Sequence, residues 1–348
     1  MSQRFSHIAL GECLRVLAIV IWALILSPQA VRAQDAFKGK TITMHVAAGA
    51  GGGYGHYGQL MAQHLGRHIP GEPNVIVSYM PGAGGLNGAN HLYNLAARDG
   101  TALGVLVSPA PVQAMMEPAA RYDVNKFNWI GVVVPVIQAL TVMRHAPAQT
   151  IEAMRETEIV AGSTGPASDT FTVPQLVNYA LGTKIKIVIG YKGTADIALA
   201  MRRGEVHAWA GPWTSKSAQF PDLLDPAIAT QLLQFGLKKP AGREAVPLLT
   251  ELVTDPAKKS VVEFLSGPTA LGYSLAAPPE VPADRIAILR NAFNAMVKDH
   301  VFLDDAKRGR SVVEATGGEE LQAIVGRITS VPPNVVAEAK RVLTPPGK

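Results

Sequence analysis

Cysteine is almost missing from this chain of 348 residues, and the only one, Cys13, precedes an apolar stretch near the N-terminus. Loss of that stretch, argued below, would leave no disulfide, no thiolate nucleophile and no cysteine metal site. Strong charge is missing too. The first 33 residues hold three arginines and one glutamate, so the 32 basic and 27 acidic residues become 29 and 26, a net charge of +3. That is too mild for a nucleic-acid binder and suits a protein with an anionic ligand.

Long apolar runs are also scarce. The run from Val16 to Leu26 is shorter than the ~20 residues of a membrane span. Basic residues precede it, and Val31 and Ala33 follow it at the positions where a signal peptidase requires small residues. The N-terminus is therefore predicted to be a secretory signal peptide, residues 1–33, cleaved after Ala33. The alternative is a retained N-terminal anchor. The remaining chain is long enough for two domains.

The stretch from Thr41 to Ile69 predicts a strand, a glycine-rich loop and a helix in succession. Residues 49–53 contain four glycines, and the helix is predicted by apolar residues at helical spacing: Tyr57, Leu60, Met61 and Leu65. Glycines let a ligand approach the backbone, and the first turn of a helix offers unpaired N–H groups. This layout is typical of an anion-binding site. The alternative is a tight turn that binds nothing.

A second strand, Asn74 to Met80, runs directly into a second glycine loop, Pro81 to Gly85. A helix is predicted from Leu86 to Ala97, followed by a buried strand from Ala102 to Val107. Two glycine loops therefore follow neighbouring strands. Ligands of open α/β sheets bind at the carboxyl ends of the strands, so we expect both loops to contribute to one site.

The strand–loop–helix pattern restarts near Ile159, which predicts a second α/β domain. The segment from Trp129 to Met143 is predicted to carry the chain into it as strands, and Ala270 to Ala276 is predicted to return. The tail is predicted to be helical over three stretches: Pro282 to His300, Glu319 to Ile328 and Val335 to Val342.

The first loop of this second domain contains Ser163, Thr164 and Gly165, and Ser168 or Asp169 is placed to cap the next helix. The hydroxyl and N–H groups of this loop can donate hydrogen bonds to a ligand carboxylate, and we consider this role more consistent with the sequence than a turn that binds nothing.

Two later residues are weaker candidates. Lys192 is either a counter-charge for the ligand or a solvated loop lysine. Trp213 either covers the site or packs at the surface.

Three other chemistries are weighed against this interpretation. Gly53, Gly55 and Gly58 form a G-x-G-x-x-G pattern, but the second strand lacks the terminal acid that a dinucleotide fold uses to hold ribose. His64 and His68 lie at helical spacing for a metal, yet no third ligand completes a set, so no metal and no cofactor are expected.

Ser163 also suggests a serine nucleophile. The chain has no G-x-S-x-G motif, and no histidine–acid pair can be assigned to it. An exported hydrolase that uses Ser163 is the alternative function.

These motifs, in order, resemble the substrate-binding receptors of tripartite tricarboxylate transporters, also called Bug-type receptors. The resemblance covers nearly the whole chain after the signal peptide. It is carried by Gly51-Gly52-Gly53-Tyr54, Pro81-Gly82-Ala83-Gly84-Gly85, Asp99-Gly100, Gly190-Tyr191-Lys192-Gly193 and the tail from Ala277-Pro278.

The resemblance implies an α/β fold, the two-domain periplasmic binding protein fold (type II-like), with two α/β domains joined by two crossing strands. Domain 1 is expected to be discontinuous, over 34–135 and 277–348, and domain 2 to span 136–276. The ligand-binding residues that it implies are Gly52, Gly53, Tyr54, Gly84, Gly85, Ser163, Thr164, Gly165 and Ser168. Lys192 and Trp213 are added from the residues themselves.

The implied function is periplasmic capture of a small carboxylate by hinge closure. The receptor would then deliver it to a small and a large membrane subunit, as a monomer that binds no nucleic acid and is not an enzyme. The other alternative is a ligand-sensing receptor without a transport role. The chain departs from the family pattern at Gly55, Gln59 and Tyr79-Met80, so the pattern does not specify which acid is bound. Tyr54, Tyr57 and Tyr79 either belong to the core or line a site for an aromatic or larger acid.

Overall fold

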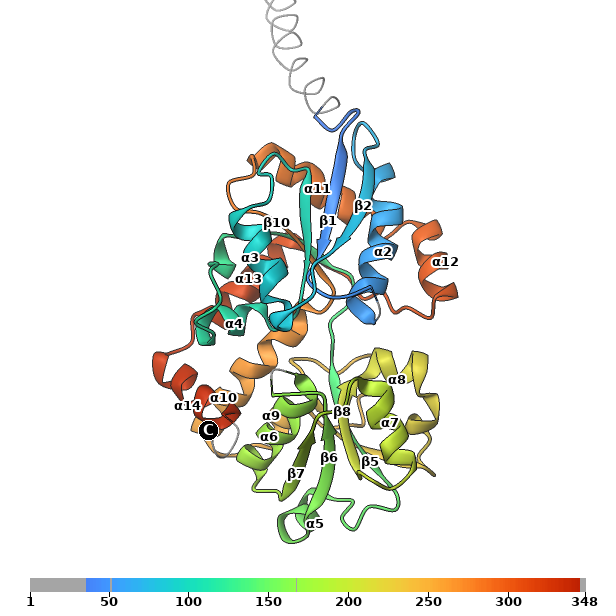
Figure 1. Cartoon of the computed structure of the whole chain (residues 1–348), viewed down its shortest axis with the longest axis vertical. Helices are drawn as coiled ribbons and strands as arrows, with labels where there is room; N and C mark the ends of the chain where they lie inside the picture. The colour runs from blue at the N-terminus through green and yellow to red at the C-terminus, as the bar shows by residue number, and fades with distance from the viewer. Residues whose placement is uncertain (1–35, 51, 167, 345–348) are drawn as a thin grey trace, which may run out of the picture.

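The structure, a computed structural model, describes residues 36–344 except Gly51 and Ala167. The predicted signal peptide, with Cys13 and the cleavage site after Ala33, lies outside these residues. Within them, two sheets flanked by helices form two lobes, one above the other in Figure 1. No helix in this described part is long and apolar enough to cross a bilayer.

The first lobe is built on a six-stranded sheet in the order β11-β4-β10-β3-β1-β2. β1 is parallel to β2 and β3, while β10 runs antiparallel to β3 and β4. The strands are β1 (Thr41–Val46), β2 (Asn74–Tyr79), β3 (Ala102–Leu106), β4 (Asn128–Val132), β10 (Ser274–Ala277) and β11 (Thr316–Gly317). The helices are α2 (Gly53–Leu65), α3 (Leu86–Asn94), α4 (Ala110–Met116), α11 (Ala283–Met296), α12 (His300–Arg308) and α13 (Gly318–Thr329).

The second lobe is built on a five-stranded sheet in the order β7-β6-β8-β5-β9. β6 is parallel to β7 and β8, and β5 runs antiparallel to β8 and β9. The strands are β5 (Gln138–Met143), β6 (Ile159–Ser163), β7 (Ile185–Ile189), β8 (Ala208–Pro212) and β9 (Ala229–Phe235). The helices are α5 (Ile151–Glu156), α6 (Asp169–Leu181), α7 (Thr194–Arg202), α8 (Trp213–Gln219), α9 (Leu249–Leu252) and α10 (Pro256–Ser266).

The last helix, α14 (Pro333–Leu343), packs against α6 and α10 rather than against the first sheet (Figure 1). One buried apolar cluster accordingly joins both lobes and includes Leu106 of β3, Leu140 of β5 and Leu265 of α10. The domain limits predicted from the sequence stay a prediction.

Two segments connect the lobes. Residues 133–137 lead from β4 to β5, and the 3-10 turn Gly267–Leu271 leads back to β10. Hydrogen bonds tie the segments together: Val133 N–H to Tyr273 O at 3.1 Å and Val136 N–H to Thr269 O at 2.9 Å. The predicted pair of crossing segments is therefore present, and the second is a turn followed by a short strand.

The predicted tail helix from Pro282 to His300 is α11, which ends at Met296, and a second helix that was not predicted, α12, begins at His300. Asp299 begins the new helix, because its carboxylate accepts a hydrogen bond from Val301 N at 2.8 Å. The sequence prediction also missed α10, where Asp255 caps the helix and Pro256 occupies its first turn. Both helices carried a local start signal, an aspartate followed by a suitable first turn.

Candidate functional site

Both sheets present the carboxyl ends of their parallel strands to the connecting segments. In the first lobe, Ser274 at the start of β10 pairs with Leu106, the last residue of β3. In the second lobe, Gln138 at the start of β5 pairs with Pro212 and Phe235, the last residues of β8 and β9. The loops that follow the parallel strands of both lobes therefore face the region between the lobes (Figure 1).

The first glycine loop brings α2 against a connecting segment. At Gly53, a Cβ atom would lie 2.1 Å from the hydroxyl oxygen of Tyr273, so only glycine fits there. The Tyr273 ring also stacks on Tyr57, with ring centroids 4.1 Å apart, and meets Tyr54 edge-on at 5.1 Å. The start of α2 is thus anchored to the part of the chain that joins the lobes.

The second glycine loop has left-handed backbone at four successive residues, 82–85. At Gly85, φ is +95° and a Cβ would lie 2.5 Å from a methyl of Val107. Both the left-handed backbone and the steric clash therefore exclude a side chain at this position. Gln113 of α4 holds the loop by donating from Nε2 to Gly84 O at 2.9 Å. Successive N–H groups in such a turn form a concave surface suited to an anion.

The three tyrosines named in the sequence differ in environment. Tyr57 is 4% exposed and belongs to the core of the first lobe. The Tyr54 hydroxyl donates to Ser108 Oγ at 3.0 Å and accepts from Ser108 N at 2.8 Å, and burial raises its pKa. Tyr79, at the end of β2, is 37% exposed and is not a core residue. Tyr54 therefore links α2 to the loop after β3.

The serine and threonine hydroxyls of the second lobe bond mainly to one another and to their own loop. Ser163 is fully buried, and its Oγ accepts from Gly165 N at 3.1 Å. Thr170 Oγ1 accepts from Thr164 N at 3.0 Å, and Ser168 donates to Gly165 O at 2.8 Å. These contacts give the loop a fixed shape.

Lys192 and Trp213 lie in different surroundings. Lys192 is exposed in the loop after β7. Trp213 is 7% exposed, its Nε1 donates to Gln234 Oε1 at 2.7 Å, and the guanidinium of Arg243 lies 4.7 Å from its ring centroid.

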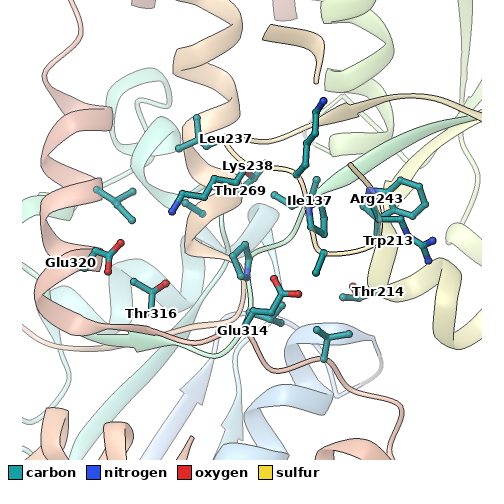
Figure 2. A pocket seen from close by; sticks show the side chains of 18 of the residues that line it. Ile137, Trp213, Thr214, Leu237, Lys238, Arg243, Thr269, Glu314, Thr316 and Glu320 are labelled. Atoms are coloured by element: carbon teal, nitrogen blue, oxygen red, sulfur yellow. The ribbon is translucent and has the colours of Figure 1, made fainter. Parts of the chain in front are cut away.

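Trp213 lines a cavity of about 360 Å³ between the lobes, called here the hinge cavity (Figure 2). Its walls come from the connecting segment at Ile137, from α8, from the loop after β9 at Lys238 and from α13 at Glu320. None of the glycine-loop residues lines it. Trp213 is thus placed by the structure in a cavity separate from the glycine loops.

A second cavity, of about 100 Å³, lies between the start of α4 and the start of α6 and is called here the α4–α6 cavity. Ser108 and Gln113 line it from the first lobe, and these are the residues bonded to Tyr54 and to Gly84. Asp169 lines it from the second lobe, immediately after the hydroxyl-rich loop. This cavity therefore adjoins loops of both lobes.

Ser108, Gln113 and Asp169 are candidate functional residues that the sequence patterns did not identify as such. Asp169 had a signal, a carboxylate one residue after a candidate ligand loop, but it was interpreted as a helix cap. In the structure Ser168 is the N-cap residue, and Asp169 lies in the first turn. Its carboxylate accepts from Gln138 Nε2 at 2.8 Å, and burial raises its pKa to about 6.

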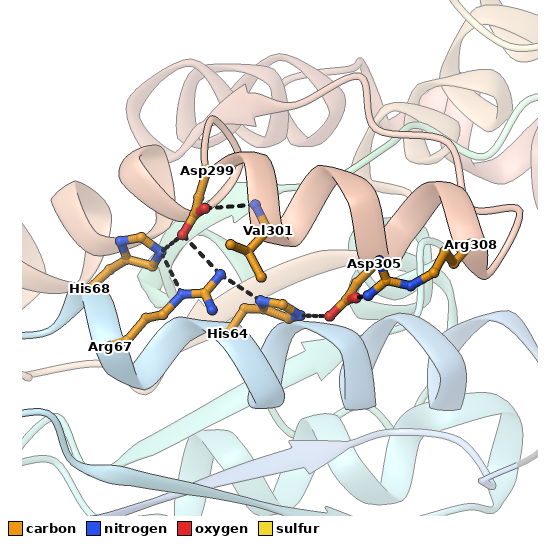
Figure 3. Close-up of polar contacts among 7 residues, drawn as sticks. All are labelled: His64, Arg67, His68, Asp299, Val301, Asp305 and Arg308. Carbon is orange, nitrogen blue, oxygen red and sulfur yellow. Dashed lines mark hydrogen bonds and ion pairs between the residues drawn. The ribbon is translucent and has the colours of Figure 1, made fainter.

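His64 and His68 take part in an ion-pair cluster that fastens α12 to α2 (Figure 3). His64 accepts from Arg67 at Nδ1 at 2.7 Å, while its Nε2 lies 2.8 Å from Asp305. Asp299 pairs with Arg67 at 2.8 Å and with His68 at 3.0 Å. Within residues 36–344, apart from the two that are left out, no group of three His, Cys, Asp or Glu side chains could hold a metal ion.

Comparison with known proteins supports the resemblance. No family model matches the chain. Among curated proteins it is similar to the "UPF0065 protein in the TAR-I ttuE-ttuC' intergenic region" of Agrobacterium vitis, at 26% identity over 237 residues. That match covers 60% of this chain and 66% of the relative, just under two thirds of the relative's length.

The solved structures show the fold. A TctC solute binding protein from Polaromonas matches with 22% identity and a TM-score of 0.66, over 87% of this chain and 97% of that one. The periplasmic binding protein BugD matches with 19% identity and a TM-score of 0.62, over the same shares.

Two further structures of this fold contain dicarboxylates. MatC from Rhodopseudomonas palustris, with bound malate, has 15% identity and a TM-score of 0.60, over 87% of this chain and 99% of that one. An R. palustris protein with adipate has 17% identity and a TM-score of 0.63, over 86% of this chain and 97% of that one. The chain thus has the two-domain fold of periplasmic binding proteins, and the resemblance to Bug-type and TctC receptors is confirmed in the fold.

Proposed function

We propose that the chain is an exported receptor that captures a small organic acid between its lobes. It would deliver the acid to the small and large membrane subunits of a tripartite tricarboxylate-type transporter. The observation that carries the proposal is that the two glycine loops and the hydroxyl-rich loop each follow the carboxyl end of a parallel strand, in sheets whose carboxyl ends lie toward the connecting segments. The export step rests on the N-terminal sequence, and the membrane partner rests on the family resemblance.

Binding would use main-chain groups rather than a charged side chain. The first turn of α2 and the left-handed turn at residues 82–85 offer N–H groups to one carboxylate, and the loop at Thr164 and Gly165 closes from the other lobe. Micromolar affinity corresponds to about −8 kcal/mol. Charge-assisted hydrogen bonds of about 1.5–3 kcal/mol each supply much of that. The segments that connect the lobes act as the hinge.

The relatives support an acid as the ligand, since two proteins of this fold were solved with malate and adipate. Similar proteins are solute-binding proteins rather than enzymes. We therefore expect no turnover. Ser163, the candidate nucleophile, is fully buried and bonded within its own loop. Ester hydrolysis that Ser163→Ala abolishes would contradict this expectation and favour the hydrolase.

The first glycine loop can be tested with a matched pair of variants. Gly52 has φ +90° and a Cβ there would meet nothing within 4 Å, and Gly182, at the far end of α6, has φ +72° and the same open space. Both alanine variants strain the backbone by roughly 1–3 kcal/mol, so both should lower the melting temperature. Calorimetry with a panel of organic acids should show at least a tenfold loss of affinity for Gly52→Ala alone. Equal affinities in both variants would refute the assignment of this loop.

A further inference from the structure

The α4–α6 cavity has an unusual chemistry for a protein thought to hold acids. Its lining includes two carboxylates, Asp169 and Glu117, together with the amide of Gln113 and the hydroxyl of Ser108. No lysine, arginine or histidine lines it. Thr172 and Thr269 also line it. The remaining walls are apolar, from Pro109, Val112, Met116, Phe235, Leu265, Pro268 and Leu343. A ligand carboxylate in this cavity would meet like charge and no counter-charge.

Asp169 is poorly neutralised. Its carboxylate accepts one hydrogen bond from a neutral amide, Gln138 Nε2 at 2.8 Å. Among the described residues no lysine, arginine or histidine lies within ion-pair distance of it. The first turn of α6 supplies only the partial positive charge of the helix. A buried carboxylate without a cation is costly, which suggests a partner that arrives with the ligand.

Two buried amide oxygens, those of Gln138 and Gln113, also lack a hydrogen-bond donor. Gln138 is 1% exposed, and its Oε1 is buried with no hydrogen-bond partner among the described residues. Gln113 Oε1 is buried and unpartnered in the same way. Neither amide can be reversed to correct this. Gln138 must turn its nitrogen to Asp169, and Gln113 must turn its nitrogen to Gly84 O.

The cavity and its border therefore hold a carboxylate with no cation and two amide oxygens with no hydrogen-bond partner among the described residues. The lining supplies neutral amide and hydroxyl groups but no positive charge. We infer that the ligand carries an ammonium group, which occupies the α4–α6 cavity and pairs with Asp169 while the ligand's carboxylate lies on the glycine loops. The receptor then selects amine-bearing carboxylic acids over dicarboxylates. About 100 Å³ is room for an ammonium and a short stretch of carbon chain. This inference rests on the proposed function and specifies its ligand.

The same arrangement sets a pH dependence. Burial raises the pKa of the Asp169 carboxyl to about 6, and an ammonium binds only the ionised form. The groups around it are Gln138 on β5, Ser108 before α4, Gln113 within α4, Glu117 at the end of α4 and Tyr54 on α2. Affinity for an amine-bearing acid should fall roughly tenfold between pH 7 and pH 5, because the ionised fraction falls by that factor.

The test uses pairs of acids matched in length, in which an ammonium replaces one carboxylate: 6-aminohexanoate with adipate, and 4-aminobutanoate with succinate. Calorimetry at pH 7 on the whole mature chain should show tighter binding of the amine-bearing member, by at least tenfold, in each pair that binds. Asp169→Asn should abolish that preference and leave affinity for dicarboxylates equal or higher. Glu152→Gln, which neutralises an exposed acid in the first turn of α5, is the matched control and should change nothing.

The outcomes are separable. If dicarboxylates bind at pH 7 and amine-bearing acids do not, the cavity does not hold an ammonium group and the inference is wrong. If the preference survives in Asp169→Asn, the ammonium is held elsewhere and the inference is also wrong. If no acid of either kind binds, the proposed function fails with it. Melting curves of each variant show whether it is folded.

Discussion

Replacement of Asp169 by asparagine should stabilise the ligand-free protein, although it removes a residue assigned here to the ligand. Asparagine has nearly the same shape as aspartate, and its side-chain oxygen can still accept the hydrogen bond from Gln138 Nε2. Its NH₂ group can donate toward the unpartnered Gln138 oxygen. The substitution therefore removes one poorly compensated charge and little else.

The magnitude follows from the pKa of Asp169, which burial raises from 3.8 to about 6. A folded-state pKa above the unfolded one means that the carboxylate disfavours folding once it is ionised. This cost is absent below about pH 4, grows between pH 4 and 6, and is complete above pH 6. At about 1.4 kcal/mol per pKa unit, the full cost is about 3 kcal/mol, an upper value because the residue keeps some contact with solvent. For a protein of this size that corresponds to roughly 4–6 °C.

Melting temperatures of the wild type and Asp169→Asn should therefore coincide at pH 3.5–4 and separate progressively up to pH 6.5, with the variant higher. Glu152→Gln serves again as the control, and its difference from the wild type should stay small at every pH. A variant that melts below the wild type at pH 7, or a difference that does not change with pH, would refute the reasoning that Asp169 is an unneutralised charge.

Two further predictions concern the cluster that joins α2 to α12. Asp299→Ala should lower the melting temperature, because it removes the cap on Val301 N and an ion pair with Arg67, and amide exchange should accelerate first in α12. Burial, followed by the nearby Arg67, lowers the pKa of His64, so this side chain favours the folded state while neutral. Stability should fall as the pH drops below 6.5, and His64→Gln, which can still accept from Arg67 and donate to Asp305, should flatten that slope in acid denaturation curves.

Much of the architecture was predictable from local pattern. Runs of β-branched residues identified β1 and β2, and a short apolar run identified β3. Apolar spacing at Tyr57, Leu60, Met61 and Leu65 predicted the buried face of α2. The order of motifs pointed to two α/β lobes with a return crossing near residue 270, and the structure shows both. These features are local because strand, turn and helix preferences depend on neighbours in the sequence.

The roles of individual side chains were harder to predict from the sequence. Ser163 and Ser168 carry the hydroxyls that a carboxylate site needs, yet the fold directs both into hydrogen bonds within their own loop. Trp213 follows a strand end as a site residue would, yet it lines the hinge cavity with Arg243 over its ring. The sequence pattern could not show this, because the partners come from other turns and strands.

That glycine loops follow neighbouring strands could be predicted from the sequence, since glycine content and strand propensity are properties of consecutive residues. The surroundings of Asp169 became known from the folded structure alone. Its isolation depends on the absence of a cation from α4, from β9 and from the turn at residues 267–271, segments far apart in the chain. A carboxylate's charge state is set by every group within several ångströms of it, and that neighbourhood exists only after folding.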